Sequence, residues 1–219
     1  GAGYEVTVID LAPHPLGRLV PAEVGTAVRD ALAAVGVTWR LNTSVKSVDH
    51  ADERLAVMLS DGTQLSADVV LSAIGLRSRI QSAAAAGLAV NRGIVTDRFL
   101  ATSVTDIYAL GDCAEIEGLL LPFVMPLMHG ARALAKTLAG EATALSYPAM
   151  PVVVKTPACP LVVAPPPAQA QGRWESTVAG ANVRAVFYGD GGAILGFALT
   201  GTAVADKQSL AKTLPPLLT

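Results

Sequence analysis

Three positions with residue types that can contact a cofactor lie at the ends of short apolar runs. Asp10 ends the run "YEVTVID", Gly75 ends the run "DVVLSAIG", and Asp112 follows "YALG". In open α/β sheets, ligands bind outside the carboxyl ends of the strands. An acidic side chain there can accept hydrogen bonds from ligand hydroxyl groups, and a glycine lets a ligand lie against bare backbone. Each position is therefore a candidate cofactor contact.

Each candidate also has a purely structural interpretation. Asp10 could simply open the loop "LAPHPLG", Gly75 could be an ordinary turn glycine, and Asp112, beside Gly111, could be a turn residue. Aspartate and glycine are both common in turns, because aspartate bonds its own backbone and glycine accepts a positive φ. The residue types by themselves leave both interpretations open.

Asp10 has the position and charge of the acidic residue in a dinucleotide-binding unit. In such a unit the second strand ends in a carboxylate that accepts hydrogen bonds from the adenosine ribose hydroxyls and disfavours a 2′-phosphate, which selects NAD over NADP. The GxGxxG loop of the unit is absent from the 219 residues, and no helix follows Gly1 and Gly3. The chain is therefore expected to be a piece of a longer protein, with the phosphate-binding half of this site upstream.

Local patterns predict the elements that must position Asp10. A helix is expected over 22–35, between strands at 4–10 and 37–41, because its apolar residues recur at helical spacing. An alternation with a period of two, around the turn signal Asp61-Gly62, predicts an antiparallel meander within 45–65. A strand, a helix and a second strand thus come before a small antiparallel sheet.

The following elements carry the other two candidates. The continuous apolar run over 68–75 is typical of a strand buried on both faces of a parallel sheet. A second short strand is expected over 106–112. A helix follows, with Pro126 in its first turn, an apolar stripe, and Gly140 at its end.

The composition changes near Tyr147-Pro148, where prolines begin to interrupt short β-branched runs. This change predicts a domain boundary. Beyond it, three strands joined by glycine-containing turns and a closing helix near 204–214 indicate a small, β-rich α+β domain. The fold class predicted for the whole chain is α/β.

Charge and composition exclude several classes of function. The net charge is −2 and the basic residues are scattered, which argues against nucleic-acid binding. No run reaches the roughly 18 to 20 apolar residues of a membrane helix, and no secretory signal is present, so we expect no membrane insertion and a cytoplasmic location. Cys113 and Cys159 form no CxxC pair, which leaves neither an adjacent dithiol nor a zinc cluster; both are expected to be small buried residues.

A succession of motifs resembles a known family. The runs "VTVID", "LSDGTQLSADVVLSAIG" and "TSVTDIYALGDCA", followed by a helix beginning "MPLMHGARALAKTLAG", are similar to the second half of the FAD- and NAD-dependent pyridine-nucleotide oxidoreductases of the glutathione-reductase fold. The resemblance covers residues 1 to about 140. In that family the aspartate of the YALGD run binds a hydroxyl of the FAD ribityl chain. The resemblance therefore implies that Asp112, with Gly111 beside it, contacts the flavin.

The same resemblance implies a division into three parts. Residues 1–75 would be the latter part of an NAD-binding domain, residues 76–146 the returning part of an FAD-binding domain, both Rossmann-like, and residues 147–219 a C-terminal domain. The stretch "VVVKTPACPLVVAPPP" is similar to the rubredoxin-reducing members of the family. This likeness implies electron transfer from NADH through FAD to rubredoxin or a similar small iron carrier.

Further flavin contacts follow from this implied site. The free amide groups and the dipole at the start of the helix would stabilise negative charge on N1 and the C2 carbonyl of a reduced flavin, and Pro126 and Leu127 would be the nearest backbone. Lys155 either adds a positive charge near the same edge or is an exposed lysine on an edge strand. Hydride transfer needs no acid–base pair, and no catalytic residue is predicted.

Two alternatives to a rubredoxin reductase stay open. A flavorubredoxin or ferredoxin reductase would differ only in its electron acceptor. A truncated, non-catalytic remnant would only bind a partner. The fragment alone is not expected to be active, because the phosphate-binding loop is not among its residues.

Overall fold

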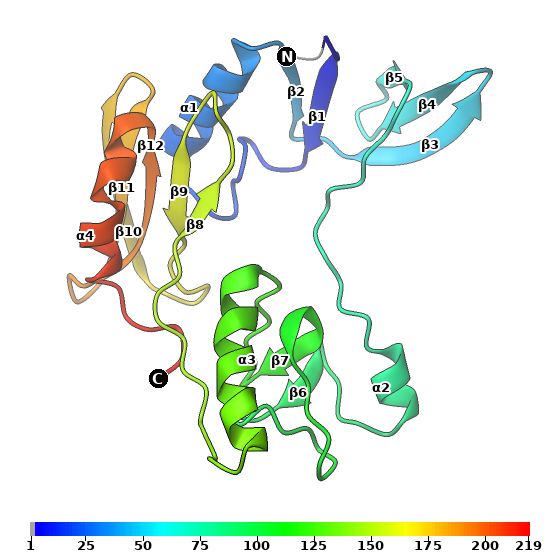
Figure 1. Cartoon of the computed structure of the whole chain (residues 1–219). Coiled ribbons are helices and arrows are strands. Elements are labelled where there is room, and N and C mark those ends of the chain that lie inside the picture. The colour runs from blue at the N-terminus through cyan, green and yellow to red at the C-terminus, as the bar shows by residue number, and fades with distance from the viewer. Residues whose placement is uncertain (1–2) are drawn as a thin grey trace. The chain divides into compact units, whose positions relative to one another are not determined.

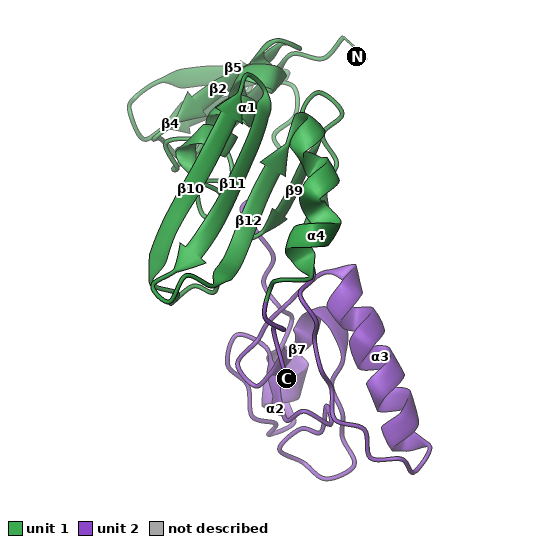
Figure 2. Ribbon diagram, turned by 90° about the vertical axis from the view of Figure 1, so that its left-hand side faces the viewer, with its two compact units in different colours: residues 1–72, 151–214 green, residues 73–150, 215–219 purple. Residues whose placement is uncertain are grey.

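A computed structural model describes residues 3–219 of the chain, which divide into two compact units (Figure 1). Unit 1 runs to Ser72 and continues from Pro151 to Leu214, and unit 2 comprises Ala73–Met150 and Pro215–Thr219 (Figure 2). Gly1 and Ala2 lie outside the described residues. The division into an NAD-binding part, an FAD-binding part and a C-terminal domain stays a prediction.

Unit 1 begins with a strand, a helix and a second strand, as expected. β1 (Val6–Asp10) pairs in parallel with β2 (Val37–Leu41), and α1 (Ala22–Ala33) connects them. After α1, Gly36 takes a φ of +96°, a left-handed conformation that favours glycine at a helix end. The parallel register places Asp10 opposite Leu41, at the carboxyl edge of both strands.

The antiparallel meander is also confirmed. β3 (Val45–Ala51), β4 (Arg54–Leu59) and β5 (Gln64–Ala67) form a three-stranded sheet in sequence order. In the turn between β4 and β5, Gly62 has a φ of +87°, and Asp61 Oδ1 accepts a hydrogen bond of 2.9 Å from the Thr63 amide. The turn signal of the sequence thus acts through the mechanism expected of it.

The strand predicted over 68–75 is wrong. This part of the backbone is extended but pairs with no described strand, and its apolar side chains lie in solvent: Val69 is 81%, Leu71 84% and Ile74 94% exposed. A strand of the parallel type is stable only where neighbours complete its hydrogen bonds and cover both faces. Without such neighbours the segment forms an open connection that leads from unit 1 into unit 2 (Figure 1).

A five-stranded antiparallel sheet forms the larger part of unit 1. Its strands are arranged in the order β10-β11-β12-β9-β8. Their bounds are β8 (Val152–Val154), β9 (Leu161–Ala164), β10 (Gly172–Ala179), β11 (Asn182–Gly189) and β12 (Ile194–Thr200). The closing helix is shorter than predicted, because the 3₁₀ turn η2 (Gly201–Asp206) precedes α4 (Lys207–Ala211).

The two faces of this sheet bury separate cores, because side chains alternate along each strand. Val24 and Val28 of α1 pack with Val183 and Ala198 on one face. On the other face, a second cluster contains Val186, Phe197, Leu199 and Leu210, the last of these from α4. α1 and α4 therefore cover opposite faces of the sheet, as Figure 2 shows.

Unit 2 is smaller and centres on a short parallel sheet. β6 (Ile94–Thr96) pairs with β7 (Ala114–Ile116), and α2 (Gln81–Ala85) and α3 (Val124–Leu138) are its helices. α3 carries Pro126 in its first turn, and Gly140, with a φ of +95°, follows its end, both as predicted. Its core contains Leu100, Ala109, Ile116, Ala133 and Leu145.

The strand predicted over 106–112 is wrong in its position. Tyr108 forms only a single bridge, with Ala101, and Gly111 has a φ of +85°, which ends the extended backbone. The 3₁₀ turn η1 (Gly111–Cys113) follows, and the regular strand begins only at Ala114. Asp112 therefore lies in a turn that precedes a strand.

Two further expectations concern the burial of the cysteines and the membrane-spanning potential of the helices. Cys159 is buried, as expected, but Cys113 is only partly buried, because it lies in the η1 turn and not in a strand. Among the helices of residues 3–219, none is long and apolar enough to cross a membrane.

Candidate functional site

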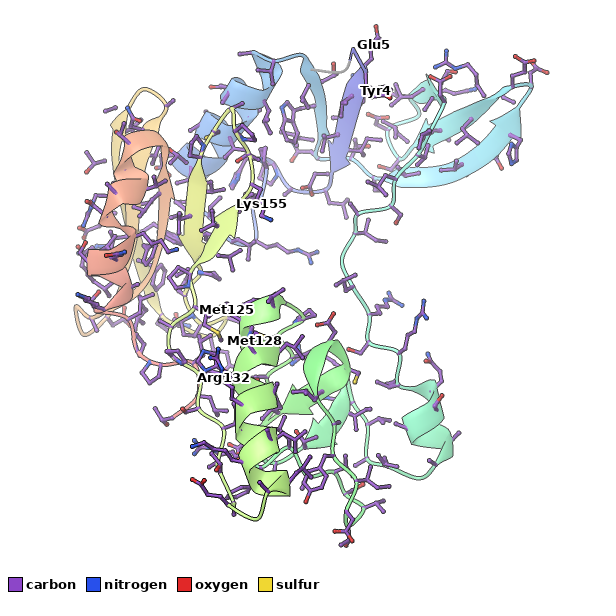
Figure 3. The ribbon with its side chains drawn as sticks, in the orientation of Figure 1. Tyr4, Glu5, Met125, Met128, Arg132 and Lys155 are labelled. Atoms are coloured by element: carbon purple, nitrogen blue, oxygen red, sulfur yellow. The ribbon has the colours of Figure 1, made fainter. Side chains whose placement is uncertain are left out.

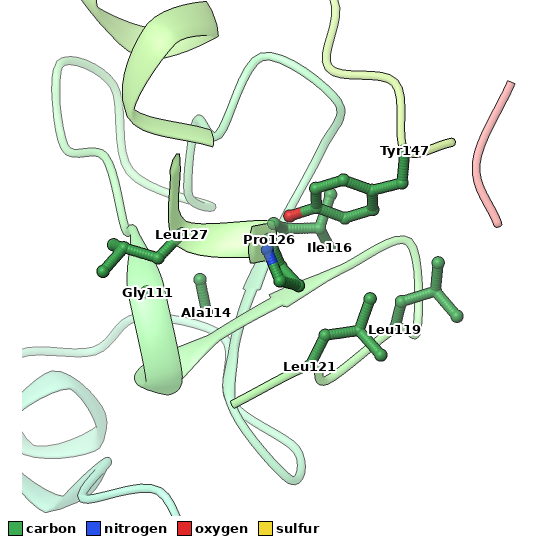
Figure 4. A pocket seen from close by; sticks show the side chains of 8 residues that line it. All are labelled: Gly111, Ala114, Ile116, Leu119, Leu121, Pro126, Leu127 and Tyr147. Atoms are coloured by element: carbon green, nitrogen blue, oxygen red, sulfur yellow. The ribbon is translucent and has the colours of Figure 1, made fainter. Parts of the chain in front are cut away.

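The η1 turn packs against the first turn of α3, and this contact brings three predicted residues together. A Cβ atom placed on Gly111 would lie 3.3 Å from Leu127 Cδ1, so the glycine permits a close approach in addition to its positive φ. A small hollow of about 10 Å³ lies where the two meet. Its lining comprises Gly111, Ala114, Ile116, Leu119, Leu121, Pro126, Leu127 and Tyr147, all labelled in Figure 4.

This hollow is part of the packing and not a ligand cavity. Its volume is at the lower limit for one water molecule, which needs roughly 10–15 Å³. The ring of Tyr147 points toward Pro126 (Figure 4) and belongs to the core of unit 2. The hollow thus shows that η1, β7 and the start of α3 are packed as one block, which fixes Gly111, Pro126 and Leu127 relative to one another.

The Asp112 carboxylate lies on the surface of this block. Its side chain is exposed and accepts no hydrogen bond from the residues that the structure describes. Its backbone is held, since the Asp112 carbonyl accepts a hydrogen bond of 2.7 Å from Ser78 Oγ. A fixed backbone with a free carboxylate is an arrangement that can accept a hydrogen bond from a ligand hydroxyl.

The first turn of α3, which packs against the η1 turn, has free backbone amide groups. No side chain caps the helix at Phe123, and Pro126 has no amide hydrogen. The amides of Val124 and Met125 therefore have no acceptor within the helix. With the positive end of the helix dipole, they favour an electronegative group of a ligand at this end.

Glu115 is an important residue that the sequence interpretation missed. It is only 3% exposed and accepts hydrogen bonds of 2.9 Å from both the Gly93 amide and Asn91 Nδ2. Burial alone would raise the pKa of Glu115, but the hydrogen bonds from Gly93 and Asn91 and the charge of Arg92 outweigh it and lower that pKa. The sequence signal that could have identified Glu115 as a buried carboxylate is its place inside the short apolar run "CAEI".

Asp10 takes part in the turn that follows β1. Its Oδ1 atom accepts a hydrogen bond of 2.9 Å from the Ala12 amide, and its carbonyl accepts one from the Thr43 amide. These contacts show that Asp10 stabilises the loop after β1, which was one of its two interpretations. Asp10 belongs to unit 1, and its contact with a ribose stays a prediction.

Gly75 has a backbone reason to be glycine. Its φ is +105°, and no atom lies within 4 Å of the place where a Cβ would be. The strand that was expected to carry it is absent, so Gly75 lies in the open connection at the start of unit 2. Its contact with a cofactor stays a prediction.

Lys155 follows directly after β8, the last strand at one edge of the five-stranded sheet. Its side chain is exposed (Figure 3) and borders an apolar hollow of about 290 Å³, together with Val153, Pro157, Leu161 and Val204. Lys155 thus has the surroundings of an exposed lysine beside an edge strand, which was one of its two interpretations. Lys155 belongs to unit 1, and its contact with a flavin stays a prediction.

The residues around Asp112 fit one part of a flavin cofactor. A carboxylate without a partner can bind a hydroxyl group, and the amides at the start of α3 can bind an electronegative ring edge. The described residues contain no glycine-rich loop leading into a helix for a pyrophosphate. The fit therefore concerns the middle of the cofactor and one edge of its ring.

Comparisons with known proteins identify the family of the chain. A family model described as pyridine nucleotide-disulphide oxidoreductase matches residues 1–135, and one described as rubredoxin binding C-terminal domain matches residues 144–214. The α/β fold class is confirmed by the family match and by the solved structures.

Relatives match the chain over nearly its whole length. The rubredoxin-NAD(+) reductase of Alcanivorax borkumensis is 51% identical over 99% of this chain and 57% of the relative, and that of Acinetobacter baylyi is 47% identical over 99% and 56%. A ferredoxin reductase from Rhodopseudomonas palustris superposes with a TM-score of 0.83 at 27% identity, covering 94% of this chain and 52% of that one. The chain thus spans little more than half the length of these proteins. Because the first family model covers more than half of the chain, the chain belongs to the pyridine nucleotide-disulphide oxidoreductase family.

Proposed function

We propose that the chain is part of a flavoprotein that transfers electrons from NADH through FAD to rubredoxin. The observation that carries the proposal is the combination of the two family matches in one chain, an oxidoreductase part over 1–135 and a rubredoxin-binding part over 144–214. Relatives named rubredoxin-NAD(+) reductase match 99% of this chain at 51% and 47% identity, which supports the proposal.

Asp112 is the residue of this chain that would hold the middle of the cofactor. Its exposed carboxylate would accept a hydrogen bond from a hydroxyl of the ribityl chain, while the Ser78 hydroxyl holds its backbone in place. Gly111 allows the turn to approach Leu127, so that the cofactor contact lies beside the start of α3. A flavin held there would supply the chemistry that links two-electron hydride transfer from NADH to single-electron transfer to an iron centre.

The start of α3 would favour electron uptake by the flavin. The free amides of Val124 and Met125 and the helix dipole would stabilise negative charge on the ring edge that lies next to Pro126 and Leu127. Lys155 would contribute a positive charge to the same end of the ring. Asp10 would accept hydrogen bonds from the ribose of NADH, and Gly75 would let that cofactor lie close to the backbone.

The charge of the C-terminal part suits an acidic carrier protein. Residues 144–214 contain five basic and three acidic residues, although the whole chain has a net charge of −2. Opposite charge on a partner speeds the encounter of two proteins and orients it. A small acidic iron protein is therefore the partner class that this part favours.

The acceptor assay tests this proposal on the complete protein that carries the chain. We expect NADH to reduce a bound flavin and rubredoxin to be reduced with a higher kcat/KM than a flavorubredoxin or a ferredoxin. A preference for either of the other carriers would assign the protein to the alternative acceptor. A colourless complete protein that takes up no FAD would overturn the proposal. The cytoplasmic location expected from the sequence stays a prediction.

A further inference from the structure

Glu115 is a buried carboxylate that takes no part in the proposed electron transfer. It lies in β7 opposite Val95 of β6, and its side chain is 3% exposed. A carboxylate in such a place reduces stability unless hydrogen bonds satisfy it. Glu115 lies three residues after Asp112, so the segment that it binds can affect the backbone at Asp112.

The two Glu115 oxygens bind one tight turn. Oε2 accepts the Gly93 amide and Oε1 accepts Asn91 Nδ2, each at 2.9 Å. The turn is closed by a hydrogen bond of 2.8 Å from the Asn91 amide to the Gly93 carbonyl. Together with Arg92, these donors lower the pKa of Glu115, so the carboxylate is charged at neutral pH.

The turn that Glu115 binds packs closely against the backbone next to Asp112. A Cβ on Gly93 would lie 2.8 Å from the Cys113 carbonyl oxygen, which leaves no room for a side chain. The carbonyl of Asp112 itself is held by Ser78 Oγ at 2.7 Å. Two successive carbonyls of the η1 turn are therefore in close contact with neighbouring segments, one with Ser78 and one with the turn that Glu115 binds.

We propose that Glu115 is a positioning residue for the cofactor contact at Asp112. By binding the turn 91–93, it fixes the Cys113 carbonyl and thereby the direction in which the Asp112 carboxylate points. The inference rests on the proposed function, because it takes Asp112 to be a flavin contact.

A double-mutant cycle on the complete protein tests this inference. The dissociation constant of FAD and the melting temperature of the apoprotein are measured for the unchanged protein, Glu115→Gln, Asp112→Ala and the double variant. Glu115→Gln removes the negative charge, and the contact with Asn91 is kept only if the Asn91 amide turns its oxygen toward the new side-chain nitrogen. Glu117→Gln removes a nearby exposed carboxylate and serves as the matched control.

The expected result is a non-additive effect. Glu115→Gln weakens FAD binding about five-fold or more when Asp112 is present, and less than about two-fold in the Asp112→Ala background. Glu117→Gln leaves FAD binding unchanged. An equal effect of Glu115→Gln in both backgrounds, or a lower melting temperature with unchanged FAD binding, would overturn the positioning role. Unchanged FAD binding in Asp112→Ala would overturn the flavin contact itself.

A compensating variant keeps the test decisive if Glu115→Gln folds poorly. In the double variant Glu115→Gln with Asn91→Asp, the side-chain oxygen of the introduced glutamine accepts the Gly93 amide, and its nitrogen donates to the introduced carboxylate. Both hydrogen bonds are thereby restored with donor and acceptor exchanged between the two side chains. We expect FAD affinity within about two-fold of the unchanged protein. Recovery of the melting temperature without recovery of FAD affinity would contradict the inference.

Discussion

Asp112 and Glu115 are acidic residues of one short stretch with opposite surroundings. Glu115 is enclosed and has two donors, whereas Asp112 is exposed and accepts no hydrogen bond from a described residue. A buried carboxylate with its donors in place contributes to the fold. An exposed carboxylate on a fixed backbone is free to bind a ligand. At the scale of single residues, the burial and the hydrogen bonds thus separate a structural role from a binding role.

The lowered pKa of Glu115 predicts how stability depends on pH. The folded state binds a proton at this group less readily than the unfolded state does. The stabilising contribution is therefore complete above the ordinary glutamate pKa of about 4.3 and is lost as the pH falls through the lower pKa of the folded state.

We accordingly expect Glu115→Gln to reduce the free energy of unfolding at pH 7 and to reduce it much less near pH 3. Urea denaturation followed by circular dichroism, with Glu117→Gln as the control, measures this difference. A loss of equal size at both pH values would show that the charge of Glu115 does not contribute.

At the scale of elements, the turn 91–93 and β7 fit together with no space to spare. Gly93 has a φ outside the left-handed region, so its need for glycine is steric and not conformational. A Cβ there would meet the Cys113 carbonyl at 2.8 Å and the Glu115 amide nitrogen at 3.0 Å. Backbone atoms cannot move aside as the end of a side chain can.

Gly93→Ala is therefore expected to lower the free energy of unfolding by about 1–3 kcal/mol. Gly191→Ala is a suitable control, because Gly191 also has no positive φ and no atom lies within 4 Å of its Cβ position. Urea denaturation of both variants gives the comparison. A tolerated Gly93→Ala together with an unchanged Gly191→Ala would mean that the turn can shift away from β7.

Elements that local patterns determine could be predicted from the sequence, and elements that need distant partners could not. The helix at Pro126 and the turn at Asp61-Gly62 depend on neighbouring residues only, and both are present. The run over 68–75 has the composition of a buried strand, but burial requires neighbours, and none of the described strands provides them. The composition of a segment indicates that it can form a buried strand, but the strand forms only where neighbouring strands pair with it.

The candidate site shows the same limit. Gly111, Pro126 and Leu127 are each expected from the sequence to lie near the flavin, and in the structure they line one hollow. Glu115 was missed because its role depends on the turn 91–93, some twenty residues earlier in the chain. Such a contact leaves no periodic pattern in the sequence.

At the scale of the whole molecule, this chain contains only part of the proposed flavin site. Asp112 and the start of α3 would contact the ribityl chain and one ring edge, but no GxGxxG loop is present in the 219 residues to bind the pyrophosphate. The phosphates carry the charge of the cofactor, and a helix preceded by such a loop supplies their main contacts.

The 219-residue chain is therefore expected to bind FAD more weakly than micromolar. Titration with FAD, followed by the quenching of flavin fluorescence or by isothermal calorimetry, measures the dissociation constant. A submicromolar value would show that Asp112 and α3 provide most of the binding free energy by themselves.

The packing of α1 joins two stretches of the chain that are far apart in sequence. Val24 and Val28 lie in one core with Val183 and Ala198, although the open connection at 68–75 and the whole of unit 2 lie between them in sequence. A break within that connection would cut the chain into two pieces that share a hydrophobic core. The pieces 1–72 and 73–219 would then be held together without a peptide bond, as in a split protein whose fragments complement each other.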